Sequence, residues 1–267
     1  FKFVDINKDL YEYAATFGAN LKEKNLSEIE IYLSESFEFC TAFFGALAIG
    51  VKPILLAKPI YSGDKFVIND ENFGDFLDFS KSMELKFDQN STFFLQTSGS
   101  SGASKNIQKR LGAMIDEGLF LKDELGFNKG DKFFASVSHQ HMFGLTFKIF
   151  LPLISGAKAV SKELNYPEAI FELDLTNLSF VTSPVLLQTL VSSPRAAEIS
   201  GLKNIICAGS ALKSELRAKI ESLSSARIIE IYGSTETGIV ARNLGDELLL
   251  FSKVKAGLSE DEALNVS

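Results

Sequence analysis

Short apolar runs alternate with segments of helical periodicity along most of this chain. Residues 29–33 and 53–56 are short apolar runs, whereas residues 9–24 repeat apolar side chains at helical spacing. Parallel strands require long crossover connections, and a helix usually supplies them. The alternation therefore predicts an α/β fold in which helices pack on mostly parallel sheets.

The same reading divides the chain into predicted elements. Helices are predicted at residues 9–24, 37–49, 111–125, 143–153 and 185–191, and at a segment with Leu212, Leu216, Ile220 and Leu223 on one face. Strands are predicted at residues 29–33, 53–56, 92–96, 132–137, 157–160, 178–182, 204–208, 226–231 and 247–251. Residues 61–89 are less regular and indicate a small insertion or a junction, so we consider subdomains at 1–90 and 91–245.

Composition excludes several classes of protein. Hydrophobic residues make up 46% of the 267 residues, enough for a substantial core. A net charge of −7 without a long basic tract argues against nucleic acid as a partner. Cys40 and Cys207 form neither a disulfide framework nor a metal-ligand pattern, which favours a cytoplasmic setting. The nearly all-apolar stretch at residues 39–51 is too short to cross a bilayer, so we expect no integral membrane segment.

Residues 97–105 form a loop of glycines and hydroxyl residues that ends in Lys105 and directly follows an apolar run. Such a loop presents backbone N–H groups, hydroxyls and one positive charge to an anion such as a phosphate. Gly99 and Gly102 allow the backbone to approach the anion closely. A flexible Gly/Ser connector would have the same composition. The spacing differs from the Walker pattern G-x-x-x-x-G-K-[ST], which disfavours a Walker NTPase.

Residues 232–238 follow the apolar run at 228–231 and combine an aromatic ring, hydroxyls and a carboxylate. Tyr232 offers a flat ring for a nucleobase, Thr235 a donor for phosphate, and Glu236 a hard oxygen ligand for Mg²⁺. An ordinary strand-to-loop turn contains similar residues. Both segments fall at predicted strand ends, however, where α/β proteins bind ligands.

These segments carry a resemblance to a known superfamily. Residues 97–105 resemble the T-S-G-[ST]-[ST]-G-x-x-K phosphate loop of the AMP-forming adenylating enzymes, and residues 232–238 resemble their Y-G-x-T-E motif. That superfamily contains acyl- and aryl-CoA synthetases, adenylation domains of peptide synthetases, and luciferases. Weaker matches lie between them in the expected order: His141-Met142-Phe143-Gly144, the proline-led helix start at Ser183-Pro184, and Ala208-Gly209-Ser210-Ala211-Leu212.

The resemblance implies roles for individual residues. Catalytic roles fall to Lys105, His141, Thr235 and Glu236, and Glu236 is also the implied Mg²⁺ ligand. Nucleotide binding falls to Thr97, Ser98, Gly99, Ser100, Ser101, Gly102, Lys105, Gly209, Ser210, Ala211, Tyr232, Gly233, Ser234 and Thr235. The acid substrate would contact His141, Met142, Phe143, Gly144 and Gly209. His139 is interpreted as an ordinary packed or exposed histidine.

The resemblance also implies an activity. An acyl or aryl carboxylic acid would react with Mg-ATP to give an acyl-adenylate and pyrophosphate. A thiol of CoA, or of phosphopantetheine on an acyl carrier protein, would then receive the acyl group. Adenylation domains of peptide synthetases place an Asp near residues 138–143 to pair the substrate ammonium, and this chain has no acidic residue there. An α-amino acid substrate is therefore disfavoured.

The chain departs from the superfamily after Gly238. We find no match there to the ribose-binding Asp, the hinge or the small carboxyl-terminal domain with its catalytic Lys. We therefore expect residues 1–267 to be an incomplete amino-terminal AMP-binding domain that lacks the carboxyl-terminal domain. Two alternatives stay open: a non-catalytic module that binds ATP or AMP, and a phosphotransferase that releases ADP instead of AMP.

Overall fold

The computed structural model describes residues 3–4, 9–97, 104–243, 247–258 and 264–266. In these residues the strands form two main sheets and one separate hairpin. The smaller sheet has the order β4 (Phe66–Asn69), β2 (Glu28–Tyr32), β3 (Lys52–Leu55), β5 (Thr92–Thr97) and β6 (Lys105–Arg110). Its first four strands are parallel, and β6 pairs antiparallel with β5. This sheet therefore ends in the hairpin that flanks the predicted phosphate loop.

Among the described residues, the larger sheet has eight strands. Its order is β1 (Phe3–Val4), β8 (Lys158–Val160), β7 (Lys132–Ala135), β9 (Ser179–Thr182), β10 (Asn204–Cys207), β11 (Arg227–Ser234), β12 (Gly238–Asn243) and β13 (Leu248–Leu250). The strands from β8 to β11 are parallel, whereas β12 runs antiparallel to β11. The separate hairpin pairs β14 (Ala256–Leu258) with β15 (Leu264–Val266). The mostly parallel α/β fold predicted from the sequence is confirmed.

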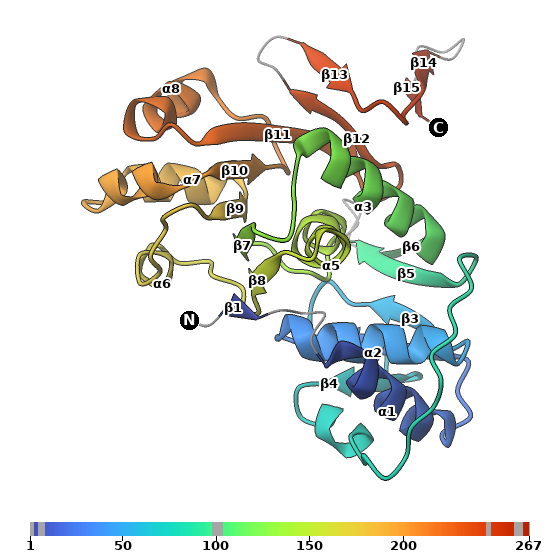
Figure 1. Ribbon diagram of the computed structural model, residues 1–267. Coiled ribbons are helices and arrows are strands. Elements are labelled where there is room, and N and C mark those ends of the chain that lie inside the picture. The colour runs from blue at the N-terminus through green and yellow to red at the C-terminus, as the bar shows by residue number, and fades with distance from the viewer. Residues whose placement is uncertain (1–2, 5–8, 98–103, 244–246, 259–263, 267) are drawn as a thin grey trace.

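Helices cover both sheets (Figure 1). The described helices are α1 (Leu10–Lys22), α2 (Ser36–Ala48), η1 (Phe73–Phe76), α3 (Leu111–Leu125), α4 (Met142–Gly144), the π-helical segment η2 (Leu145–Phe150), α5 (Leu151–Ser155), α6 (Pro167–Ile170), α7 (Pro184–Val191), η3 (Ala196–Gly201) and α8 (Ser214–Leu223). Helices α1 and α2 pack together beside the smaller sheet, α7 and α8 lie along the larger one, and α3 lies between β6 and β12 (Figure 1).

Two apolar clusters hold these layers together. In the first, which connects the two sheets, the ring of Phe43 lies 5.0 Å from that of Phe93 and 6.3 Å from that of Phe150, measured between centroids. In the second, Phe134 of β7 and Phe180 of β9 stack at 4.3 Å against residues of α7 and α8. Burial of such large apolar surfaces is the main force that stabilises a fold of this kind.

Two segments illustrate how the structure differs from the sequence-based prediction. Residues 143–153 were predicted as one helix, but α4, η2 and α5 form a helix that is interrupted by the π-helical segment. Residues 105–110 were not predicted as a strand, because Ile107 is the only apolar residue in β6. Pairing with β5, and not its own hydrophobic pattern, makes this segment a strand. No described helix has the length and the apolar character needed to cross a membrane.

Candidate functional site

The phosphate-loop prediction falls on the hairpin between β5 and β6. Thr97 and Lys105 are the last paired residues of this hairpin, and the Thr97 hydroxyl donates a hydrogen bond of 3.4 Å to the Lys105 carbonyl. The Lys105 side chain is exposed. The other residues predicted for phosphate binding, Ser98, Gly99, Ser100, Ser101 and Gly102, lie outside the described residues. The structure thus places only the two ends of the predicted loop.

The second motif forms the turn between β11 and β12, which we call the 234–238 turn. Ser234 and Thr237 close it reciprocally: each backbone N–H donates to the other residue's hydroxyl oxygen, and both bonds measure 3.2 Å. Gly238 has φ of 78°, a conformation that L side chains rarely adopt. Hydroxyl residues and a left-handed glycine therefore give the turn a defined shape that presents Thr235 and Glu236.

Glu236 is exposed on this turn, and its pKa is lowered. Its own backbone N–H contributes most to this shift, followed by the Ser234 hydroxyl and, more weakly, the charges of Lys109 and Lys105. The Lys109 ammonium also donates a hydrogen bond of 3.1 Å to the Glu236 carbonyl. Strand β6 therefore brings Lys105 and Lys109 close to the second motif, as expected if both motifs serve one ligand.

Many of the predicted site residues line a cavity of about 210 Å³. Its lining comes from three separate segments of the chain: His141, Met142 and Phe143; Ala208 and Gly209; and Ile231, Gly233, Ser234, Thr235 and Ile239. These segments lie at or just beyond the carboxyl ends of β7, β10 and β11, the position where parallel sheets bind ligands. The weaker sequence matches at 141–144 and 208–212 therefore meet the second motif in space.

Other predicted residues lie beside this cavity without lining it. Tyr232 is 47% exposed, so its ring is free to contact a ligand at the surface. Ser210 and Ala211 are also exposed, directly after Gly209, whose φ is 96°. Gly144 is buried. The structure thus gives an open surface around Tyr232 next to a more enclosed cavity.

His141 and His139 have different surroundings. His141 is exposed at the cavity, although desolvation by the protein around the ring still lowers its pKa, so that its imidazole is neutral near pH 7. His139 is 3% exposed, and its Nε2 lies 2.8 Å from the Leu33 carbonyl. That carbonyl only accepts hydrogen bonds, so Nε2 carries the proton and Nδ1 accepts from the buried Lys148 ammonium at 3.4 Å. His139 is therefore a packed histidine that bridges the Leu33 carbonyl and the Lys148 ammonium.

The arrangement of donors suits Mg²⁺ bound together with a phosphate ligand. Within the described residues, no group of three or more His, Cys, Asp or Glu side chains could hold a metal ion. Glu236 alone supplies an exposed, ionised carboxylate beside the Thr235 hydroxyl. Mg²⁺ is commonly held by one or two carboxylates plus substrate phosphates, and the residues present fit that mode.

Sequence reasoning missed two residues that accept or donate hydrogen bonds within the 234–238 turn or directly after it. Lys109 donates to the Glu236 carbonyl, and the carboxylate of Glu117 accepts a hydrogen bond from the Ile239 backbone N–H at 2.8 Å. A signal for Glu117 was available. It lies on the apolar face of α3 between Met114 and Leu121, where a carboxylate is unusual unless it has a partner.

The chain is similar to known proteins in sequence and in fold. Residues 58–259 match the family model described as "AMP-binding enzyme". Enterobactin synthase component F of Shigella flexneri is 26% identical over 171 residues, which cover 60% of this chain and 13% of that protein. The chain therefore spans only a small part of that relative.

Two solved structures share the fold. ATP-bound MatB from Rhodopseudomonas palustris matches with a TM-score of 0.83 and 16% identity, over 96% of this chain and 61% of that one. A benzoate CoA ligase from Burkholderia xenovorans LB400 matches with a TM-score of 0.81 and 18% identity, over 95% of this chain and 62% of that one. At these identities the likeness shows the fold alone.

Proposed function

Because the chain belongs to the AMP-binding enzyme family, we propose that it activates a carboxylic acid with Mg-ATP as part of an AMP-forming ligase. The products are an acyl-adenylate and pyrophosphate, and a thiol of CoA or of a phosphopantetheine carrier then receives the acyl group. MatB was solved with ATP bound, and another structure with this fold is a benzoate CoA ligase. Both support ATP and a carboxylic acid as substrates.

The observation that carries this proposal is the convergence of three sequence segments on one cavity. His141, Gly209 and Thr235 line it, although they are widely separated in the chain. Glu236 and Lys105 lie on the adjoining turn and hairpin, and the Lys105 charge contributes to the lowered pKa of Glu236. Adenylation needs an acid pocket, phosphate donors and a metal ligand side by side, and these segments supply the residue types for all three.

The chain's own residues act mainly by positioning and by neutralising charge. A carboxylate oxygen of the acid bonds to the α-phosphorus of ATP, the bond from that phosphorus to the bridging oxygen breaks, and pyrophosphate leaves with the electron pair. The Thr235 hydroxyl donates to the α-phosphate, and the Lys105 ammonium attracts the departing pyrophosphate. Mg²⁺ held by Glu236 would neutralise part of the phosphate charge. Neutral His141 borders the acid without adding a positive charge.

The lining also indicates the kind of acid. Phe143, Ile231 and Ile239 give the cavity apolar walls, and none of its lining residues is acidic. An ammonium group would find no carboxylate partner there, and leaving it unpaired in a desolvated site costs several kcal/mol. An acyl or aryl acid without an α-amino group therefore fits best.

The test is carboxylic-acid-dependent exchange of labelled pyrophosphate into ATP by the natural full-length protein. A panel of aliphatic and aromatic acids should support exchange, and the product nucleotide of complete turnover should be AMP. ADP as the product would indicate a phosphotransferase instead. Binding of Mg-ATP without exchange for any acid would favour a non-catalytic nucleotide-binding module.

A further inference from the structure

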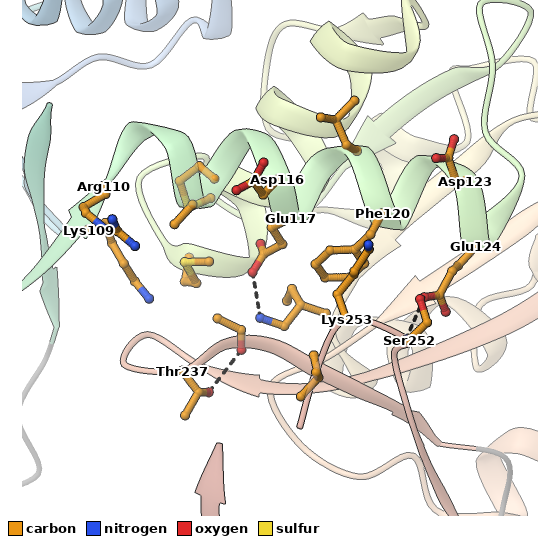
Figure 2. A pocket seen from close by; sticks show the side chains of 17 residues that line it. Lys109, Arg110, Asp116, Glu117, Phe120, Asp123, Glu124, Thr237, Ser252 and Lys253 are labelled. Atoms are coloured by element: carbon orange, nitrogen blue, oxygen red, sulfur yellow. Dashed lines mark hydrogen bonds between the residues drawn. The ribbon is translucent and has the colours of Figure 1, made fainter. Parts of the chain in front are cut away.

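A second cavity lies next to the 234–238 turn, and it shares Met142 and Ile239 with the cavity that His141 lines. It has a volume of about 760 Å³ and lies between α3 and two later segments, residues 237–239 and 252–254 (Figure 2). Figure 2 shows Glu117 projecting from α3 toward the strand that begins at Gly238. The strand that continues from the turn therefore contacts α3 at Glu117.

Glu117 makes hydrogen bonds through both of its carboxylate oxygens. Oε2 accepts from the backbone N–H of Ile239 at 2.8 Å, and Oε1 accepts from the hydroxyl of Thr146 at 2.6 Å. The residue is only 8% exposed. Burying a carboxylate is costly unless hydrogen bonds compensate for the lost water, so a carboxylate here must be held by these partners.

Gly238 and Lys109 complete the contact between the turn and this part of the fold. A Cβ added at Gly238 would lie 2.5 Å from Glu117 Oε2, so a side chain at this position would displace the carboxylate oxygen that accepts from the Ile239 N–H. Lys109, two residues before α3, donates to the Glu236 carbonyl at 3.1 Å. Two side chains thus fix the turn on both sides of Thr237.

We infer that Glu117 is a positioning residue that fixes the 234–238 turn, and with it Thr235 and Glu236, relative to the hairpin that carries Lys105. Helix α3 directly follows β6, so the hydrogen bond from Ile239 to Glu117 connects the turn to the same stretch of chain that carries Lys105. The inference rests on the proposed function, because Glu236 and Lys105 matter together only if they bind one Mg-ATP.

The experiment compares Glu117→Ala and Glu117→Gln in the natural full-length protein. Gln keeps an acceptor for the Ile239 N–H, whereas Ala removes it. The matched control is Glu124→Ala on the same helix, because Glu124 accepts a hydrogen bond of 2.7 Å from the Ser252 N–H, away from the motif. The readouts are pyrophosphate exchange, binding affinity for ATP as a function of Mg²⁺ concentration, and melting temperature.

Glu117→Ala should weaken the apparent affinity for Mg-ATP and slow exchange, each by about tenfold to a hundredfold, as expected for losing hydrogen bonds to a charged group. Glu117→Gln should keep most of the wild-type affinity for Mg-ATP and most of the wild-type exchange rate. Glu124→Ala should lower the melting temperature without changing the Mg-ATP affinity or the exchange rate.

The inference is overturned if Glu117→Ala affects only the melting temperature, or if Glu124→Ala has the same effect on Mg-ATP affinity. If the wild type binds Mg-ATP but exchanges no pyrophosphate, the proposed function fails while the binding data still decide the role of Glu117. A wild type that binds no ATP would overturn both.

Discussion

Glu117 and Ile239 lie 122 residues apart in the chain, and the Ile239 backbone N–H donates a 2.8 Å hydrogen bond to the Glu117 carboxylate. The bond connects the helix that follows the first motif to the strand that follows the second. Neither residue belongs to a motif that the sequence resemblance identified. A buried contact of this kind has consequences for stability as well as for the site.

The first prediction concerns Glu117 and pH. Burial raises the pKa of this carboxyl above its usual value of 4.5, against smaller lowering effects from the Ile239 N–H, the Thr146 hydroxyl and Lys109. The native state therefore binds this proton more tightly than the unfolded state does. The free energy of unfolding of the wild type therefore falls as pH rises above 4.5. Glu117→Gln has no such loss. Urea unfolding should show the free energy of unfolding of the variant rising relative to that of the wild type as pH increases above 4.5, and an unchanged or reversed difference would contradict the raised pKa.

The second prediction concerns the close approach at Gly238. Gly238→Ala places a methyl group 2.5 Å from Glu117 Oε2 in a residue with φ of 78°. Gly126→Ala is the matched control, because Gly126 has φ of 76° and nothing within 4 Å of the added Cβ. The control should lose about 1 to 2 kcal/mol from backbone strain, and Gly238→Ala about 1 to 3 kcal/mol more from overpacking. Equal losses of unfolding free energy in the two variants would show that Gly238 does not pack closely against Glu117.

The third prediction separates the anion contact from the metal contact. Lys105→Ala should weaken ATP binding by about tenfold or more, whether or not Mg²⁺ is present, because an ammonium attracts phosphate directly. Glu236→Ala should leave metal-free ATP binding intact and reduce the gain that Mg²⁺ provides. Lys219→Ala, on the exposed surface of α8, controls for general loss of positive charge. ATP titrations with and without Mg²⁺ distinguish these outcomes, and identical behaviour of Lys105→Ala and Glu236→Ala would refute the separate roles.

The fourth prediction concerns the buried Lys148, which is 1% exposed. Desolvation lowers its pKa from 10.5 to about 8, despite the opposing charges of Glu163 and Glu35. Between pH 8 and pH 10.5 the unfolded state binds more protons at this lysine than the native state does. The buried lysine therefore destabilises the native state less as pH rises. The stability of the wild type relative to Lys148→Met should therefore increase between pH 8 and pH 10.5. A flat difference in calorimetric melting temperature across that range would show that Lys148 is not desolvated.

Local sequence patterns predicted most of the secondary structure. The helix at residues 111–125 was predicted with its observed bounds, because its apolar periodicity ends at Gly126, which adopts a left-handed conformation after the last turn. Patterns failed where pairing or packing set the conformation. Strand β6 has almost no apolar residues and exists because β5 supplies its hydrogen bonds. The π-helical segment Leu145–Phe150 has the same apolar character as an α-helix, so periodicity alone does not distinguish it.

The sequence also predicted some features of the candidate site and missed others. The order of the motifs predicted that His141, Gly209 and Thr235 belong together, and the structure places all three around one cavity. The roles of individual residues stay predictions. Lys109 and Glu117 had no motif to mark them, since their function depends on what they touch.

The sequence by itself determined the alternating α/β architecture, the chemical groups of both motifs and the family, because these depend on residue type, order and short-range spacing. Only the tertiary structure decided that a carboxylate on α3 meets the backbone of β12 and that Lys109 meets the Glu236 carbonyl. Hydrogen bonds between residues more than a hundred positions apart leave no periodic trace in a single sequence. They form because packing of the two sheets around a shared core brings those segments within a few ångströms of each other.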